Sequence, residues 1–172
     1  VDYAGNPCDW PNLRYIGNKY NLSLINDNCH AIGSKINNNS KYAIKYADII
    51  SQSFQTLKNI TTGEGGAVIT NNFDIYKKIN VLRTHGLIKD LNSKKFWDSE
   101  MNELGFNYRI TDFQSALGIS QLKKINTFIK KRRIIARTYN KFFSSYGDLI
   151  SPHVKKNIFH ACKHNAPGPG TM

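Results

Sequence analysis

The sequence predicts an α/β fold that ends in a long helix, and two patterns carry this prediction. Apolar runs of strand length alternate with segments of helical periodicity along the first half of the chain, which is typical of α/β proteins. From Thr111 onward, apolar residues recur three and four positions apart, as on one face of a long helix. The 172 residues suffice to bury one core, and no apolar run approaches the roughly 18 residues that a membrane span needs.

Four short strands are expected before the long helix, at residues 1–4, 22–25, 47–54 and 67–70. The run at 22–25 is apolar and stops at Asn26 and Asp27, which predicts a buried parallel strand with polar residues at its C-terminal end. The polar stretch 33–41 is expected to be a loop, and the glycine-rich stretch 62–66 a tight turn before the last strand.

Capping residues predict where the helices begin. Asp9 is expected to cap a helix that runs to about Tyr20, and Asn72 a helix over 74–83. Thr111 or Asp112 can cap the long helix. The tail at 166–170 alternates Pro and Gly and is not expected to pack.

The chain is basic, with 24 Lys and Arg against 12 Asp and Glu and a formal net charge of +12. Such a charge can attract nucleic acid, so a non-catalytic basic module that binds nucleic acid or a partner is the alternative function. Lys, Asn and Ile are abundant together, which indicates that the positive charge reflects a general drift in composition and not a binding surface. The densest basic cluster, Lys130-Lys131-Arg132-Arg133, is expected to be a solvated face of the long helix.

The three cysteines, Cys8, Cys29 and Cys162, form no Cys-x-x-Cys pair. Their odd number argues against a disulfide framework and favours a reducing, cytoplasmic setting. His160, Cys162 and His164 offer three donors without a fourth, so no metal site is expected there.

Four polar residues are expected at neighbouring strand ends: Asp27, His30, Ser53 and Lys58. Taken singly, Asp27 can be a helix cap and His30 a packed polar residue. Together they supply what a pyridoxal phosphate site needs, namely a carboxylate for the pyridinium, a lysine for the Schiff base and a hydroxyl for the phosphate. The glycines at 63–66 match neither a Walker loop nor a dinucleotide fingerprint.

Four stretches of the sequence resemble the DegT/StrS family of pyridoxal-phosphate sugar aminotransferases: 26–34, 53–68, 83–86 and 104–118. Their order and spacing match the family across about residues 1–145. The sequences at 1–9 and 60–66 are most similar to those of the branch that aminates C4 of UDP-linked 4-keto-6-deoxy-N-acetyl sugars on the way to pseudaminic acid.

The resemblance implies the three-layer α/β/α large domain of a fold-type I pyridoxal-phosphate transferase, with a mostly parallel sheet. Residues 1–145 are expected to be the C-terminal part of that domain, and 146–172 the start of the small domain or a disordered tail. Family members are about twice this length or more. The sequence is therefore expected to be a fragment that lacks the preceding phosphate-binding turn and ring-stacking aromatic residue.

The resemblance also implies a role for each candidate residue. Lys58 would form the Schiff base with pyridoxal 5'-phosphate and carry protons as a general base. Asp27 would keep the pyridinium nitrogen protonated, and His30 would pack on the ring or contact its 3′-oxygen. Ser53 would bind the cofactor phosphate, and Asn107 would bind it from the partner subunit of a homodimer.

The activity that the resemblance implies is a ping-pong transfer of an amino group from glutamate to a keto-sugar nucleotide, in amino-sugar and surface-polysaccharide biosynthesis. A related branch has His at the Schiff-base position and removes a sugar hydroxyl, so Lys58 favours transamination. Asn26 stands where the family often has an acid, and Gln55 where a His is common. Nucleic acid and membranes are not expected as partners.

Overall fold

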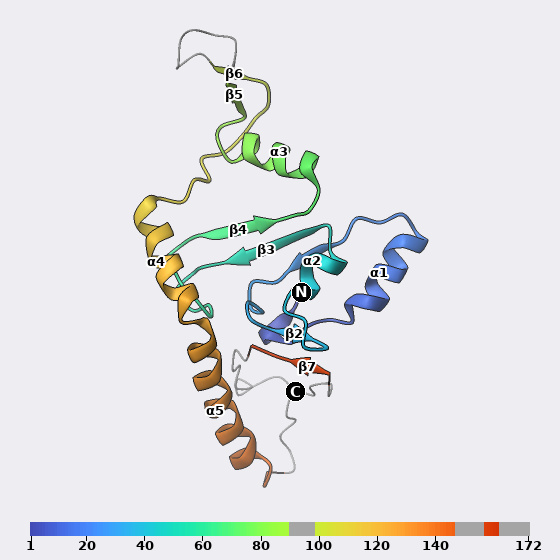
Figure 1. The fold of residues 1–172 in the computed structure, drawn as a ribbon, viewed down its shortest axis with the longest axis vertical. Helices are drawn as coiled ribbons and strands as arrows, with labels where there is room; N and C mark the ends of the chain where they lie inside the picture. The colour runs from blue at the N-terminus through green and yellow to red at the C-terminus, as the bar shows by residue number, and fades with distance from the viewer. Residues whose placement is uncertain (90–98, 147–156, 162–172) are drawn as a thin grey trace.

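The computed structural model describes residues 1–89, 99–146 and 157–161, and the fold is α/β, as predicted (Figure 1). In chain order its elements are η1 (Tyr3–Gly5), α1 (Trp10–Lys19), β1 (Ile25–Asp27), β2 (Lys35–Ile36), α2 (Tyr42–Tyr46), β3 (Ile49–Ser53), β4 (Gly66–Ile69), α3 (Phe73–Leu82), β5 (Leu87–Lys89), β6 (Ser99–Met101), α4 (Asp112–Lys123), α5 (Ile125–Phe143) and β7 (Ile158–Phe159). The tail at 166–170 and most of 146–172 lie outside the described residues.

The main sheet has the strand order β1-β3-β4. β1 and β3 are parallel, as predicted, with Asp27 opposite Ser51. β1 nevertheless covers Ile25–Asp27 instead of the expected 22–25, and within it Ile25 is exposed and Asn26 is buried. β4 runs antiparallel to β3, with Ser53 opposite Gly66. The connection from β3 to β4 contains no helix, so the chain turns back instead of crossing over to a parallel position. β1 and β3 therefore end at the edge of the sheet where β4 begins.

The core lies between β3 and the helices α1 and α2. Its buried side chains are Trp10, Ile36, Tyr42, Ala43, Ala47 and Ile50. Ile36 belongs to β2, a short strand within the stretch expected to be a loop. β2 pairs with β7, where Lys35 lies opposite Phe159, so a partner far along the chain creates this strand.

Residues 1–4 do not form the expected strand. Tyr3–Gly5 is a single 3-10 turn, and Ala4 has a φ of 53°. The geometry of this turn follows from Asp2, which is completely buried. Asp2 accepts hydrogen bonds from Trp10 Nε1 at 2.8 Å and from Tyr42 OH at 2.7 Å. Burial, reinforced by the charge of Asp2, raises the pKa of Tyr42, so its hydroxyl keeps the proton that it donates.

The helix caps predicted at Asn72 and Thr111 are confirmed, whereas Asp9 precedes α1 without a capping hydrogen bond from its side chain. The side chain of Asn72 accepts hydrogen bonds from the backbone N–H groups of residues 74 and 75, and Thr111 and Gln114 form a capping box. The long helix is divided at Lys124 into α4 and α5. Among the described residues, no helix is long and apolar enough to cross a membrane.

α5 passes closely over the loop that follows β1. Gly33 has a φ of +88°, and a Cβ at that position would lie 2.1 Å from Ile129 Cδ1. Only glycine permits both this backbone conformation and this approach. The contact fixes α5 against the loop that carries His30.

Candidate active site

The carboxyl ends of β1 and β3 bring Asp27 and Ser53 to the same edge of the sheet. Asp27 is opposite Ser51 in the parallel pair, so Ser53 lies two residues farther along the neighbouring strand. Ligands of open α/β sheets gather at this edge. Ser53 Oγ accepts the Gln55 N–H at 3.4 Å, which leaves its own hydroxyl proton available to a ligand.

Asp27 is held as a carboxylate. Its Oδ1 accepts the backbone N–H of Cys29 at 3.1 Å. Hydrogen bonding from the Cys29 thiol, opposed in part by burial, lowers the pKa of Asp27 below its ordinary value. Asp27 is half-buried, in contrast to Asp2, and a charged carboxylate in this place can stabilise a protonated ring nitrogen.

His30 is oriented by the N-terminal turn. Its Nδ1 accepts the backbone N–H of Ala4 at 3.2 Å, and its ring lies 5.6 Å from that of Tyr3, tilted by 59°. Because Nδ1 acts as an acceptor, Nε2 is the nitrogen that carries the ring proton. The ring is half-buried and keeps a defined orientation.

The loop that carries Lys58 is attached to the loop that carries His30. The next residue, Asn59, is buried and donates through Nδ2 to the carbonyl oxygens of His30, at 3.3 Å, and Ile32, at 3.1 Å. Arg132 of α5 donates through Nη2 to the Lys58 carbonyl at 3.2 Å. Lys58 is therefore fixed from two sides.

Both Asp27 and Lys58 affect the thiol of Cys29. Burial raises the pKa of the Cys29 thiol, as does its hydrogen bond with Asp27, while the positive charge of Lys58 acts in the opposite direction. The structure brings Asp27, His30, Ser53 and Lys58 together at the predicted edge.

Within this chain, Asn107 does not lie at this edge of the sheet. It is exposed and lies in an extended segment, where it forms a bridge with Thr84. Near it in the sequence, Leu104 is 83% and Phe113 91% exposed. The resemblance places Asn107 in the site of a partner subunit, and its exposure on this surface is compatible with that role.

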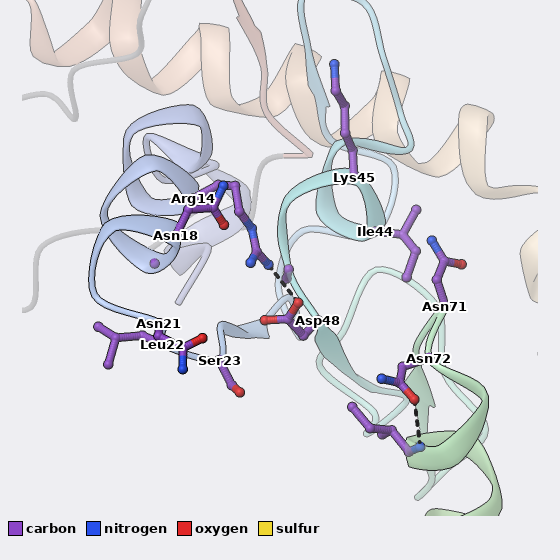
Figure 2. Close-up of a pocket in the computed structure, with 13 residues that line it drawn as sticks. Arg14, Asn18, Asn21, Leu22, Ser23, Ile44, Lys45, Asp48, Asn71 and Asn72 are labelled. Atoms are coloured by element: carbon purple, nitrogen blue, oxygen red, sulfur yellow. Dashed lines mark hydrogen bonds and ion pairs between the residues drawn. The ribbon is translucent and has the colours of Figure 1, made fainter.

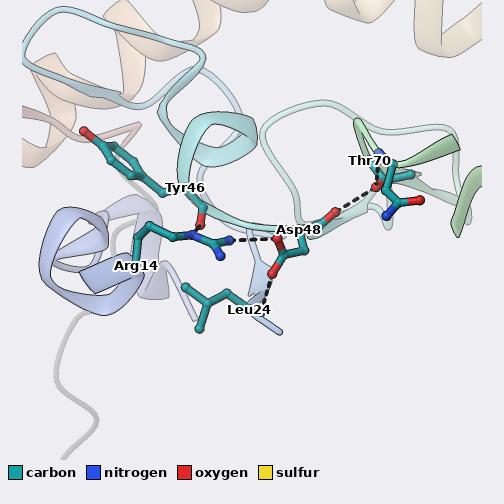
Figure 3. A network of polar contacts seen from close by, with 6 residues as sticks. Arg14, Leu24, Tyr46, Asp48 and Thr70 are labelled. Atoms are coloured by element: carbon teal, nitrogen blue, oxygen red, sulfur yellow. Dashed lines mark hydrogen bonds and ion pairs between the residues drawn. The ribbon is translucent and has the colours of Figure 1, made fainter. Parts of the chain in front are cut away.

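A large pocket lies at the opposite edge, where β1 and β3 begin. Figure 2 shows this pocket of about 820 Å³, with Arg14 and Asp48 between α1 and the start of β3. Asp48 pairs with Arg14 at 2.9 Å and accepts the Leu24 N–H at 2.7 Å, and its carbonyl accepts from Thr70 Oγ1 at 2.7 Å (Figure 3). These contacts tie three strand ends together, so this polar network has a structural role that sequence reasoning missed.

The described residues hold no group of three His, Cys, Asp or Glu side chains that could bind a metal ion. Cys162 and His164 lie outside the described residues. His160 is described, and burial together with the charge of Arg133 lowers its pKa. Cys8 and Cys29 are free thiols.

The side chains at the carboxyl edge fit pyridoxal phosphate. They comprise an amine on a fixed loop, a carboxylate with a lowered pKa, a hydroxyl with a proton to donate and an oriented imidazole. Asn59 and Arg132, which position Lys58, were not found from the sequence. Both act through contacts between residues distant in the chain, and no local pattern reveals such contacts.

Solved structures with the same fold are aminotransferases. Helicobacter pylori PseC, described as an aminotransferase of pseudoaminic acid biosynthesis, superposes with a TM-score of 0.76 at 36% identity. That match covers 86% of this chain and 38% of PseC. The aminotransferase TlmJ from Streptoalloteichus hindustanus has the same fold, with a TM-score of 0.83 at 21% identity over 93% of this chain and 42% of TlmJ. The chain thus has the fold of part of these aminotransferases.

The chain belongs to the DegT/DnrJ/EryC1/StrS aminotransferase family, whose sequence profile matches residues 1–167. The UDP-4-amino-4,6-dideoxy-N-acetyl-beta-L-altrosamine transaminase of Campylobacter jejuni serotype O:2 is 45% identical over 143 residues, covering 83% of this chain and 36% of that enzyme. An uncharacterized protein of Methanocaldococcus jannaschii is 41% identical over 165 residues, which is 94% of this chain and 42% of that protein. The chain therefore spans less than half the length of these relatives, and the predicted resemblance is confirmed.

Proposed function

We propose that the protein containing this chain is a pyridoxal-phosphate-dependent aminotransferase that moves an amino group from glutamate to a 4-keto-6-deoxy sugar nucleotide. The observation that carries the proposal is the position of Lys58, held beside the Asp27 and His30 loop by the hydrogen bonds of Asn59. The family and the altrosamine transaminases among its relatives support a sugar nucleotide as the acceptor. Amino-sugar and surface-polysaccharide biosynthesis in the cytoplasm is the proposed setting.

When bound, pyridoxal phosphate supplies an electron sink that lets a proton leave and return at the carbon bearing the amino group. Lys58 would attach the cofactor covalently and, once released, move that proton. Asp27, kept ionised by its hydrogen bonds, would hold the ring nitrogen protonated. Ser53 would donate its hydroxyl proton to the phosphate, and His30 would support the ring.

The same proposal assigns residues 1–145 to the large cofactor-binding domain and 146–172 to the start of the second domain or to a tail. It also makes the active site shared in a homodimer, with Asn107 reaching the cofactor phosphate of the partner subunit. The exposure of Asn107, with exposed apolar residues near it in the sequence, supports this arrangement. None of the relatives described above favours the nucleic-acid alternative.

Borohydride trapping tests the proposal directly. The protein at its natural length is incubated with pyridoxal phosphate, reduced with borohydride and digested, and the labelled peptide is identified by mass spectrometry. We expect the label on Lys58 and none in Lys58→Ala, whereas Lys123→Ala, which removes an exposed lysine of α4, should label normally. Labelling elsewhere, or amino transfer to a keto-sugar nucleotide by Lys58→Ala, would contradict the proposal.

A further inference from the structure

A second cavity, the basic pocket, lies between α5 and the β2–β7 pair. Its volume is about 480 Å³, within the roughly 300–1,000 Å³ of small-molecule sites. Figure 1 shows α5 beside β7, with β2 nearby. Four basic residues line the pocket, Lys35, Lys130, Arg133 and Arg137, together with Gly33, Asn126, Ile129, Ile134 and Phe159.

The positive charges of the basic pocket have no acidic partners in the part of the chain that the structure describes. The salt bridges there join Arg14 to Asp48 and Lys78 to Glu103, and neither pair lines this pocket. No Asp or Glu is among the lining residues. Like charges gathered around one cavity repel one another, and an anion in the cavity relieves that repulsion.

The basic pocket is preorganised around Phe159. The guanidinium of Arg133 lies over the Phe159 ring at 3.8 Å from its centroid, and Lys35 approaches the same ring at 5.6 Å. Lys35 and Phe159 are also opposite each other in the β2–β7 pair. The close contact of Gly33 with Ile129 fixes α5 on the other side. A ligand would therefore meet two cations, Lys35 and Arg133, whose positions the Phe159 ring helps to set before binding.

The basic cluster 130–133 forms the predicted solvated face only in part, because Lys130 and Lys131 are exposed whereas Arg132 and Arg133 are half-buried. Lys130 and Arg133, one helical turn apart, line the basic pocket with Arg137, while Arg132 bonds the carbonyl of Lys58. Lys131 is exposed and lines no pocket that we describe. Because successive residues of a helix point in different directions, the side chains of this cluster contact the basic pocket, the candidate active site and solvent.

We propose that the basic pocket binds a diphosphate group. A phosphate monoester carries about −2 at neutral pH, so one phosphate would neutralise about half of the four cations and a diphosphate more. Planar guanidinium groups such as those of Arg133 and Arg137 pair with phosphate oxygens through two parallel hydrogen bonds. The diphosphate can be free or part of a nucleotide, and the experiments below separate these two sources.

Isothermal titration of the full-length protein with inorganic pyrophosphate tests the site. We expect Arg137→Gln and Lys130→Gln to weaken binding by about tenfold or more each, as expected for charge-assisted contacts, and Lys131→Gln to leave it unchanged. Lys131→Gln removes the same charge from the same helix, so it controls for net charge. Arg133→Lys keeps the charge but loses the planar group, and should still weaken binding. Equal effects of Lys131→Gln and Arg137→Gln, or no pyrophosphate binding to the folded wild-type protein, would overturn the proposal.

Two further titrations identify the source of the diphosphate. If UDP competes with pyrophosphate and binds more tightly, the site takes the diphosphate of a nucleotide; if pyrophosphate binds and UDP does not compete, the ligand is a free diphosphate. Lys58→Ala should bind pyrophosphate as wild type does. If pyrophosphate does not bind to the basic pocket but borohydride labels Lys58 normally, the proposed aminotransferase function therefore still stands.

Discussion

The buried carboxylate of Asp2 is the contact on which we expect the N-terminal half of the fold to depend most. Asp2 is completely inaccessible to solvent. Its Oδ1 accepts from Trp10 Nε1 at 2.8 Å and the Cys8 N–H at 2.9 Å. Its Oδ2 accepts from Tyr42 OH and Asn28 Nδ2, both at 2.7 Å, and from Asn26 Nδ2 at 3.1 Å.

Replacing Asp2 by Asn keeps the size of the side chain but converts one acceptor oxygen into a donor. If the new NH₂ group takes the place of Oδ1, two buried donors lose their acceptor, and if it takes the place of Oδ2, three do. Each unsatisfied buried donor costs about 1–3 kcal/mol. The less destabilising orientation, which leaves two donors unsatisfied, therefore predicts a loss of about 2–6 kcal/mol in the free energy of unfolding.

Urea unfolding followed by far-UV circular dichroism and tryptophan fluorescence measures this loss. Glu100→Gln removes a carboxylate from the exposed strand β6 and should change the free energy of unfolding by less than about 0.5 kcal/mol. If Asp2→Asn unfolded within about 1 kcal/mol of wild type, the reasoning would be refuted, because the five donors would not need a carboxylate. A change in the fluorescence of the folded variant would be a second sign that the contact with Trp10 is lost.

Three further predictions concern the loop and surface contacts of the candidate site. Gly33→Ala should lower the melting temperature, because it strains a residue at a φ of +88° by about 1–2 kcal/mol and brings a Cβ against α5. Asn59→Ala should weaken pyridoxal phosphate binding, measured by absorbance titration, more than it lowers the melting temperature, because it releases the Lys58 loop from His30. Mixed dimers of Lys58→Ala with Asn107→Ala should regain part of the activity that each homodimer lacks, since one site per dimer then keeps both residues; absence of any recovery would argue against a shared site.

The helix caps and the parallel strand pair could be predicted from the sequence because local signals determine them. Asn72 caps α3 with its own side chain, and Thr111 forms a capping box with Gln114 only three residues away. The apolar run at 22–25 located β1 only approximately, because the strand begins at Ile25 and includes the polar Asn26 and Asp27. These signals lie within one helical turn or one strand.

The elements that sequence reasoning missed depend on distant contacts. β2 exists because Lys35 and Ile36 pair with β7 more than a hundred residues later. The N-terminal turn replaces a strand because Asp2 bonds to side chains of α1, β1 and α2. Within the site, the strand ends that bear Asp27 and Ser53 were predictable, whereas the bond from Arg132 to Lys58 was not.

Two carboxylates near the start of the chain show why burial and hydrogen bonding decide a residue's role. The backbone N–H of Asp2 donates to the carbonyl of Asp27 at 2.9 Å, so the two residues are neighbours in space. Asp2 has all its acceptor capacity used by five donors and no access to solvent, which leaves nothing for a ligand. Asp27 is only half-buried, and within the described part of the chain its carboxylate accepts hydrogen bonds only from Cys29, which lower its pKa and leave it accessible to a cationic group. Asp2 thus holds the strand end in place, and Asp27 keeps an accessible carboxylate there for the cofactor-binding role that we propose.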